Sequence, residues 1–394
     1  MAGHKQFDLV IYGASGFTGR LVAEYMTQEY GSRVRWAMAG RNVDKLAQVR
    51  DETGAPAETP LLYADASEPA SIREMVRVTG CVLTTVGPYQ LYGSELVAAC
   101  AELGTHYVDL CGEPAWMHQM IASHSDTAAR SGARIVFSCG FDSIPFDLGV
   151  WRLQQAAIKM YGRPMPRVRG RVRAMEGGFS GGTAASFRAT LAAIAQNPGI
   201  RGVLVNPFAL ANGFTGPAQP ADNKSYEDEV VGAWVAPFMM ASINTKNVHR
   251  SNALLGHLYG EDFQYDEMMV TGPGEPGQAA ARIVATSNPL AADDLPAPGE
   301  GPSRAEREAG YYDVLFVGTS SRGEEIRLAV TGDMDAGYGS TSKMIAESAL
   351  CLVQDCDDLP GGIYTPAPAM GQKLIDRLVA RAGMTFDLLD ATDT

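Results

Sequence analysis

The chain has 394 residues, of which 46% are hydrophobic and 20% are charged, and its formal net charge is −13. This length predicts two or three domains, and this composition is typical of a globular protein that buries a large core. A protein that wraps nucleic acid needs a cationic face, so the net charge argues against nucleic acid as a main partner. It does not exclude a small anion bound by a local nest of N–H groups.

Targeting and metal patterns are not found in the sequence. The N-terminus has no charged segment followed by an apolar one, so no signal peptide is expected. The longest mainly apolar stretch, residues 230–245, is shorter than the ~20 residues that a membrane-spanning helix needs. The six cysteines form no CxxC pair and no Cys/His pattern, which favours reduced, buried thiols and no metal site. We therefore expect a cytoplasmic protein.

Strand and helix patterns alternate through the first 140 residues. The expected strands are Phe7–Tyr12, Val34–Ala39, Leu61–Tyr63, Cys81–Val86, His106–Leu110 and Arg134–Ser138. Helical spacing is found at Phe17–Tyr30, Val43–Glu52, Pro69–Val78, Ser94–Leu103 and Ala115–Ser131. This alternation predicts parallel β-α-β units. Residues 1–150 should therefore form an α/β Rossmann domain, a doubly wound parallel sheet with ligand-binding loops at the carboxyl ends of its strands.

The pattern changes near residue 165, which predicts a second domain of the α+β class over residues 165–335. Val168–Met175 alternates apolar residues with arginines and indicates a half-exposed antiparallel strand. A helix at Thr183–Gln196, an exposed loop at Asn288–Arg304 and a strand pair complete this domain; the pair is Asp313–Gly318 and Glu325–Thr331. Residues 340–394 should form a C-terminal helical segment that packs back on the Rossmann domain; its helices are Ser342–Gln354 and Ala369–Ala382.

A glycine-rich loop follows the first strand and opens the first helix. It reads Gly13, Ala14, Ser15, Gly16, Phe17, Thr18 and Gly19. In the dinucleotide-binding pattern the first glycine makes the tight turn, the second lets a pyrophosphate approach the backbone, and the third lets the helix pack on the strand. The helix N-terminus then favours the phosphate charge. The alternative is an ordinary glycine-rich turn in a flavodoxin-like domain.

The residue after the second strand distinguishes the two nicotinamide cofactors. NAD enzymes usually place an acid there, whereas this chain has Arg41, whose guanidinium can bind a 2′-phosphate in a bidentate manner. NADP(H) is therefore the expected cofactor, unless Arg41 is only a solvated residue at a helix start. Asp65 and Ala66, after the third strand, would flank the adenine. The nicotinamide side would be lined by Val86, Gly87, Pro88 and Tyr89.

Several loops resemble one known family. The motifs are Gly-Ala-Ser-Gly-Phe-Thr-Gly (13–19), Ala-Gly-Arg (39–41), Val-Gly-Pro-Tyr (86–89), Tyr-Val-Asp-Leu-Cys-Gly-Glu (107–113), Cys-Gly-Phe-Asp-Ser-Ile-Pro (139–145), Gly-Gly-Phe-Ser-Gly-Gly-Thr (177–183), Ile-Asn-Thr (243–245), Arg-Ser-Asn-Ala-Leu-Leu (250–255) and Thr-Pro-Ala-Pro-Ala-Met-Gly (365–371). Together they resemble the saccharopine dehydrogenase-like oxidoreductases, in particular the trans-acting enoyl reductases of mycobacterial lipid and polyketide synthesis. The resemblance implies an NADPH-binding Rossmann domain, a second α+β domain, and hydride transfer to an activated double bond, either C=C or C=N.

Candidate catalytic groups lie where strands four to six end. Reduction of an enoyl thioester leaves an enolate, which needs hydrogen-bond donors and then a proton. Tyr89, Asp109, Glu113 and Asp142 could serve, and so could Ser180 in the second glycine-rich loop, residues 176–183. Two of the acids have structural alternatives, because Asp142 could cap the helix that begins near Pro145 and Glu113 could begin the next helix. The second glycine-rich loop could be an oxyanion site or a hinge, and the loop 337–341 has the same two readings.

The sequence thus predicts an NADPH-dependent reductase that acts on the activated C=C bond of a lipid or polyketide acyl substrate, free or carrier-bound. A saccharopine-type imine reductase is the first alternative. It needs cationic clamps, and the available ones stand among apolar residues: Arg171, Arg173, Arg188, Lys246 and Arg250. A non-catalytic NADP(H)-binding regulator is the second alternative. It predicts tight cofactor binding without turnover.

A methionine-rich segment suggests which partners the protein could contact. Trp234, Phe238, Met239 and Met240 could pack in the core or line a lipid pocket. If exposed, they could contact a membrane surface or an acyl carrier. A homodimer is also an open expectation.

Overall fold

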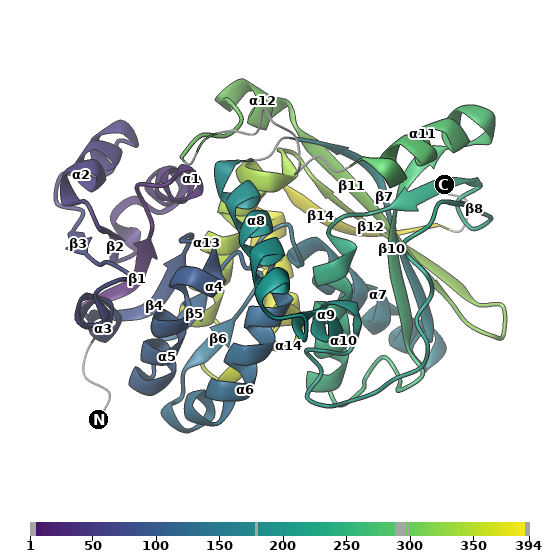
Figure 1. Cartoon of the computed structure of the whole chain (residues 1–394), viewed down its shortest axis with the longest axis horizontal. Helices are drawn as coiled ribbons and strands as arrows, with labels where there is room; N and C mark the ends of the chain where they lie inside the picture. The colour runs from purple at the N-terminus through teal and green to yellow at the C-terminus, as the bar shows by residue number, and fades with distance from the viewer. Residues whose placement is uncertain (1–4, 178–179, 288–296, 298, 391–394) are drawn as a thin grey trace.

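The computed structural model describes residues 5–177, 180–287, 297 and 299–390. They form two seven-stranded sheets, the first at the left of Figure 1 and the second at the right. The strands of the first sheet are β1 (Phe7–Tyr12), β2 (Trp36–Gly40), β3 (Leu61–Tyr63), β4 (Thr79–Thr84), β5 (His106–Val108), β6 (Arg134–Val136) and β13 (Gly362–Tyr364).

The first sheet has the order β3-β2-β1-β4-β5-β6-β13, and every neighbouring pair is parallel. Helices cover both faces. One face carries α3 (Pro69–Val78), α5 (Ser94–Leu103) and α6 (Pro114–Ser131), and the other carries α1 (Phe17–Tyr25), α2 (Val43–Glu52) and α13 (Thr341–Gln354). This arrangement confirms the predicted doubly wound Rossmann sheet, whose strands end at one common edge.

Local signals set several boundaries. Asn42 caps α2 by accepting the Lys45 N–H at 2.9 Å, and α3 and α6 begin with proline, whose missing N–H would have no intrahelical partner there. The helix expected over Phe17–Tyr30 is α-helical only to Tyr25 and continues as a π-helical turn over Met26–Tyr30.

The second sheet is mixed, with the order β14-β12-β11-β7-β10-β9-β8. Its strands are β7 (Arg167–Glu176), β8 (Tyr226–Asp228), β9 (Ala233–Pro237), β10 (Gln264–Gly272), β11 (Tyr311–Thr319), β12 (Glu325–Gly332) and β14 (Met384–Leu389). The expected strand pair is present, since β11 and β12 are antiparallel. The expectation for β7 was wrong in part, because this strand is central and pairs in parallel with β10 as well as antiparallel with β11.

The side chain of Arg171 in β7 is fully buried. It pairs with Asp228 of β8 at 2.7 Å and with Asp266 of β10 at 3.0 Å. At Arg171 the basic position of the pattern is therefore buried by ion pairs inside the sheet, whereas Arg169 and Arg173 are half-exposed, as expected. Charged residues can be buried in this way only when they are paired.

Helices α7 (Ile144–Tyr161), α10 (Ala241–Leu254) and α14 (Pro366–Arg381) pack together, and α7 packs on β11 and β12. The contact between α7 and β11 is close, because a Cβ on Gly149 would lie 2.5 Å from the Phe316 ring. The remaining helical elements are η2 (Gly31–Arg33), α4 (Tyr89–Tyr92), α8 (Gly181–Gln196), α9 (Ile200–Val205), α11 (Gly274–Thr286), α12 (Arg304–Ala309) and η4 (Ala336–Ser340). Most of the loop expected at 288–304 lies outside the described residues.

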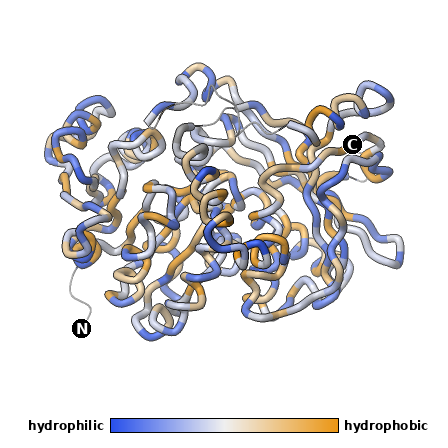
Figure 2. Tube along the Cα trace, in the orientation of Figure 1, coloured by the Kyte–Doolittle hydropathy of each residue, from blue (hydrophilic) through white to orange (hydrophobic). Residues whose placement is uncertain are grey.

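The C-terminal segment joins the two sheets. Its helix α13 packs on β4 and β5 and its strand β13 extends the first sheet, whereas β14 pairs with β12 of the second sheet. It thus adds a strand to each sheet beside the expected helices. One continuous apolar core runs from β1 through α7, α13 and α14 into β11 and β12. Figure 2 shows hydrophilic segments mainly on outer elements such as α2. No helix among the described residues is long and apolar enough to span a membrane.

Candidate functional site

The glycine-rich loop lies at the centre of the carboxyl edge of the first sheet, where β1 and β4 end side by side. Gly13 has a φ of 90°, and a Cβ there would lie 2.7 Å from Val86 Cγ2. A Cβ on Gly19 would lie 2.1 Å from the Gly13 carbonyl oxygen. Neither site can accept a side chain without movement of the backbone, so these two glycines let the loop turn tightly and let α1 pack on it.

The space above the loop is open at Gly16, the second glycine of the pattern. A Cβ on Gly16 would approach only the Gly13 carbonyl oxygen, at 3.3 Å. Gly16 is also the N-cap of α1, and no side chain caps this helix. The first-turn N–H groups and the helix dipole can therefore face an anion. A dinucleotide diphosphate fits this arrangement, with Ser15, Phe17 and Thr18 in the same turn.

Arg41 extends from the end of β2 on the same edge. Its side chain is exposed, and among the described residues it makes no ion pair or hydrogen bond. The nearby carboxylate of Asp65 is held by the N–H and hydroxyl of Ser67, both at 2.8 Å, and these hydrogen bonds lower its pKa. Ala66 follows Asp65, so both predicted adenine-side residues lie in the turn after β3. The Arg41 guanidinium is free to receive a phosphate.

The predicted nicotinamide loop, Val86 to Tyr89, ends at a buried tyrosine. The Tyr89 hydroxyl donates to the Thr84 carbonyl at 3.3 Å and accepts the Leu110 N–H at 3.0 Å. The Tyr89 N–H is in turn held by a Glu113 carboxylate oxygen at 2.9 Å. Tyr89 is thus placed to fix the loop that contains Gly87 and Pro88, and its hydroxyl is turned into the protein.

Asp109 links the ends of β5 and β6. One carboxylate oxygen accepts the N–H groups of Cys111 at 3.0 Å and Ser138 at 2.8 Å, and the other accepts the Tyr107 hydroxyl at 2.8 Å. Burial raises its pKa to about 7, although these hydrogen bonds oppose the rise. Asp109 is fully buried, so the structure places it beneath the edge, where it shapes the loops.

Asp142 is the predicted catalytic acid whose carboxyl group is not held by other residues. Its carboxylate has no hydrogen-bond partner among the described residues, and burial alone raises its pKa to about 6. The side chain lies beside the loop after β5, because a Cβ on Gly112 would be 3.6 Å from Asp142 Oδ2. The N-cap of α7 is Ser143, not Asp142. A partly buried acid with a raised pKa and no structural partner is typical of proton-transfer groups.

Ser180 lies at the start of α8, next to Tyr338 of η4. The Ser180 N–H donates to the Tyr338 hydroxyl, which also hydrogen-bonds the Thr183 hydroxyl at 3.0 Å. Burial raises the pKa of Tyr338, and the negative charge of Asp142 adds to this rise. The second glycine-rich loop and the loop 337–341 therefore meet each other near the open acid.

Sequence reasoning missed a buried polar network behind this acid. Ser143 hydrogen-bonds Asn247 at 2.6 Å, and Asn244 donates to Glu267 at 2.9 Å. Burial raises the pKa of Glu267 to about 8. The available signal was an Asp-Glu pair inside the apolar strand pattern of Gln264–Gly272. Among the described residues, no group of three or more His, Cys, Asp or Glu side chains could hold a metal ion.

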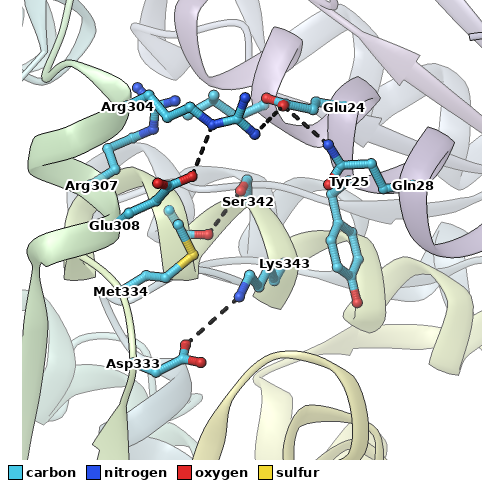
Figure 3. A pocket seen from close by; sticks show the side chains of 12 residues that line it. Glu24, Tyr25, Gln28, Arg304, Arg307, Glu308, Asp333, Met334, Ser342 and Lys343 are labelled. Atoms are coloured by element: carbon cyan, nitrogen blue, oxygen red, sulfur yellow. Dashed lines mark hydrogen bonds and ion pairs between the residues drawn. The ribbon is translucent and has the colours of Figure 1, made fainter. Parts of the chain in front are cut away.

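A pocket of about 360 Å³ lies at the C-terminal half of α1, away from the glycine-rich loop (Figure 3). Most of its charges are paired within the protein: Arg304 contacts Glu24 at 2.9 Å and Glu308 at 2.8 Å, and Lys343 is 3.7 Å from Asp333. Arg307, which also lines the pocket, donates to the Pro302 carbonyl at 2.7 Å. This pocket offers no open acid or phosphate-binding turn. The carboxyl edge of the first sheet, which has both features, is therefore the candidate functional site.

The methionine-rich segment is divided between core and surface. Phe238 is buried and packs on Phe146 with ring centroids 5.6 Å apart, whereas Met239 is 38% exposed. Met240 packs against the core.

The matches to known proteins agree with this site. The model for the saccharopine dehydrogenase NADP binding domain matches residues 9–136. The chain is 40% identical, over 97% of both chains, to a Mycobacterium tuberculosis protein whose name assigns it provisionally to the trans-acting enoyl reductases. It is 36% identical to a trans-acting enoyl reductase of Mycobacterium bovis, over 95% of this chain and 96% of the relative. Apo saccharopine dehydrogenase (L-Glu forming) from Saccharomyces cerevisiae has a similar fold, with a TM-score of 0.54 at 10% identity over 98% of this chain and 100% of that one.

The fold and the nucleotide-binding edge define a saccharopine dehydrogenase-like protein with an NADP-binding Rossmann domain. Within this class, the full-length relatives show that the chain belongs to the trans-acting enoyl reductase family.

Proposed function

We propose that the chain is an NADPH-dependent reductase that saturates the activated C=C bond of an enoyl thioester in a lipid or polyketide acyl chain. The observation that carries this proposal is the open carboxyl group of Asp142 on the same sheet edge as the phosphate-binding turn. The names of the full-length relatives agree with it.

The cofactor site would be made by three groups. The N–H groups at the start of α1 would hold the diphosphate, Arg41 would hold the 2′-phosphate, and the loop Val86–Tyr89 would position the nicotinamide. NADPH bound there supplies a hydride.

Side chains of the protein would then stabilise the developing negative charge and supply the proton. As the β-carbon gains a hydride, negative charge develops on the thioester oxygen. The Tyr338 hydroxyl accepts the Ser180 N–H and can also accept a hydrogen bond from the Thr183 hydroxyl. In that arrangement the proton of Tyr338 is free, and Tyr338 can donate it in a hydrogen bond to the thioester oxygen. Asp142 would give its proton to the α-carbon, which completes the addition of one hydride and one proton across the double bond.

The ion pairs and hydrogen bonds of the basic side chains support C=C reduction over C=N reduction. A saccharopine-type substrate carries several carboxylates that need free cations. Of the cations expected to serve, Arg171 is paired with acids, Arg250 donates to the carbonyl groups of Leu210 and Ile363, and Lys246 donates to that of Ser242. Arg173 is paired with Asp313, and of the five only Arg188 of α8 is exposed and without an ion pair among the described residues.

The test is NADPH oxidation, followed by absorbance, with a crotonyl-pantetheine thioester, an imine formed from an amino acid and a 2-oxo acid, or no added substrate. We expect oxidation with the enoyl thioester alone and one saturated thioester formed per NADPH consumed. Turnover of the imine alone would contradict the proposal. Tight NADPH binding by calorimetry without turnover of any substrate would instead favour a regulator.

A further inference from the structure

A second cavity, of about 430 Å³, lies between the Rossmann domain and the helical pair α8 and α9. We call it the α8–α9 cavity. Apolar side chains from three helices line much of its wall: Trp116 of α6, Ala193 of α8, and Ile200, Val203 and Leu204 of α9. Its size lies within the range of ~300–1,000 Å³ found for small-molecule sites.

The charge of the lining indicates which ligands fit. Glu113 is the only ionisable side chain among the lining residues. Its two carboxylate oxygens are occupied, since they accept the N–H groups of Tyr89 and Gln90 at 2.9 Å each. No lining lysine or arginine could pair with a carboxylate or a phosphate, and the acid would repel one. The cavity therefore suits an uncharged, apolar ligand.

Helix α8 connects this cavity to the candidate active site. Ser186 of α8 lies against the nicotinamide loop, because a Cβ on Gly87 would be 3.5 Å from its hydroxyl oxygen. One turn later, about 6 Å along the axis, Thr190 accepts a hydrogen bond from Gln90 at 3.3 Å and lines the cavity. The cavity thus begins about one turn of α8 away from the nicotinamide loop.

Exposed apolar residues are the sequence neighbours of residues that line the cavity. Leu91 is 62% exposed, Leu191 is 51% exposed and Val205 is 79% exposed, and their neighbours Gln90, Thr190 and Leu204 line the cavity. Helix α9 has the sequence Ile-Arg-Gly-Val-Leu-Val and no buried residue. An apolar helix that buries none of its residues indicates a binding surface for an apolar partner.

We infer that the α8–α9 cavity binds the hydrocarbon tail of the acyl substrate, beyond the thioester and the double bond. This inference rests on the proposed function for the identity of the chain that enters. The occupant is an uncharged alkyl chain, which gains the hydrophobic free energy of each methylene that leaves water.

A chain-length series tests the cavity during turnover. With trans-2-enoyl-pantetheine thioesters of increasing length, kcat/KM should rise about fourfold for each methylene buried, until the cavity is full. Ala193→Phe should fill the cavity and abolish this rise. Ala192→Phe, an exposed neighbour on the same helix, is the matched control and should keep the wild-type series. A kcat/KM independent of chain length, or equal behaviour of the two variants, would overturn the inference.

A binding test separates this inference from the proposed function. A bromoalkyl alcohol such as 12-bromododecanol should quench the fluorescence of Trp116 saturably, and both Trp116→Phe and Ala193→Phe should lose this component. Saturable quenching without turnover of any enoyl thioester would support the cavity and count against the reductase. Turnover with no Trp116 quenching would keep the reductase and overturn the alkyl site.

Discussion

Phe17 of the glycine-rich loop and Tyr338 of η4 pack edge to face, with ring centroids 5.2 Å apart and planes at 79°. Tyr338 is held in turn by Asp335, which accepts its N–H at 2.9 Å and that of Gly339 at 2.7 Å. The C-terminal part of the chain thus supports the turn that begins α1. The geometry of the glycine-rich turn therefore depends on residues far away in the sequence as well as on the loop itself.

Two glycine variants should separate folding from cofactor binding. Gly19→Ala places a Cβ 2.1 Å from the Gly13 carbonyl oxygen, whereas Gly16→Ala places one 3.3 Å from it. We expect Gly19→Ala to lower the free energy of unfolding by roughly 1–3 kcal/mol, as overpacked sites do. Gly16→Ala should keep the wild-type Tm but weaken NADPH binding. Thermal melts and calorimetry check both, and a normal NADPH affinity in Gly16→Ala would contradict this account of the loop.

Arg41→Ala should remove the preference for NADPH. A charge-assisted hydrogen bond contributes about 1.5–3 kcal/mol, so the Kd for NADPH should rise by roughly 10- to 100-fold while that for NADH changes little. Arg77→Ala is the control, because Arg77 is exposed near the end of α3, which leads into the opposite end of the first sheet. An unchanged NADPH/NADH ratio in Arg41→Ala would show that Arg41 is only a solvated residue.

The Rossmann half could be predicted because its signals are local. Each β-α unit is contiguous in the sequence, and the glycine pattern of residues 13–19 fixes one turn between β1 and α1. The expected loop positions follow, since all the parallel strands end at one edge. The sequence could thus place Arg41 and Asp142 on that edge without knowledge of tertiary contacts.

The rest depends on partners that are distant in the sequence. The hydroxyl of Tyr89 accepts the Leu110 N–H, and the carboxylate of Asp109 accepts the Ser138 N–H. Residues adjacent in the sequence do not reveal these hydrogen bonds, so they could not distinguish Tyr89 and Asp109 from catalytic groups. Strand β14 joins the second sheet by pairing with β12, and no periodic pattern in the sequence indicates this pairing. Burial of Arg171 likewise needs Asp228 and Asp266.

Three buried acids should make stability fall as the pH rises from about 4 to 8. Burial raises the pKa of Asp109 to about 7, of Asp147 to about 7 and of Glu267 to about 8. These acids keep their protons in the folded state at pH values where the unfolded chain has lost them. Their contribution is full below the unfolded pKa, near 4, and is lost as the pH passes the folded values. Melting curves across this range should show a steadily decreasing Tm.

Glu267→Gln should make this decrease shallower, because the amide stays uncharged and can still hydrogen-bond Asn244 and Tyr265. Glu227→Gln, an exposed position on β8, should leave the pH profile as in the wild type. Equal slopes in the wild type and Glu267→Gln would contradict a protonated Glu267 in the fold.

The two arginines of β7 should differ in their effect on stability. Arg171→Met removes the buried partner of Asp228 and leaves Asp266 with Arg167 alone, and it should cost about 3–5 kcal/mol of unfolding free energy. Arg173 pairs with Asp313, and both side chains are partly exposed, at 26% and 29%, so Arg173→Met should cost no more than about 1 kcal/mol. Denaturant melts of both variants provide the comparison. A small effect at Arg171 would mean that its ion pairs do not stabilise the second sheet.

Asp142→Asn should separate proton transfer from cofactor binding. Loss of a general acid typically lowers the rate by 10²- to 10⁴-fold, so kcat with an enoyl thioester should fall by about this much while the Kd for NADPH stays unchanged. The pKa of Asp142 is about 6, raised by burial. As the acid must be protonated to act, wild-type kcat/KM should fall as the pH rises through this value, and the residual activity of Asp142→Asn should lack this step. A rate that rises with pH through the same value would make Asp142 a base, and a full rate in Asp142→Asn would assign the proton to another group.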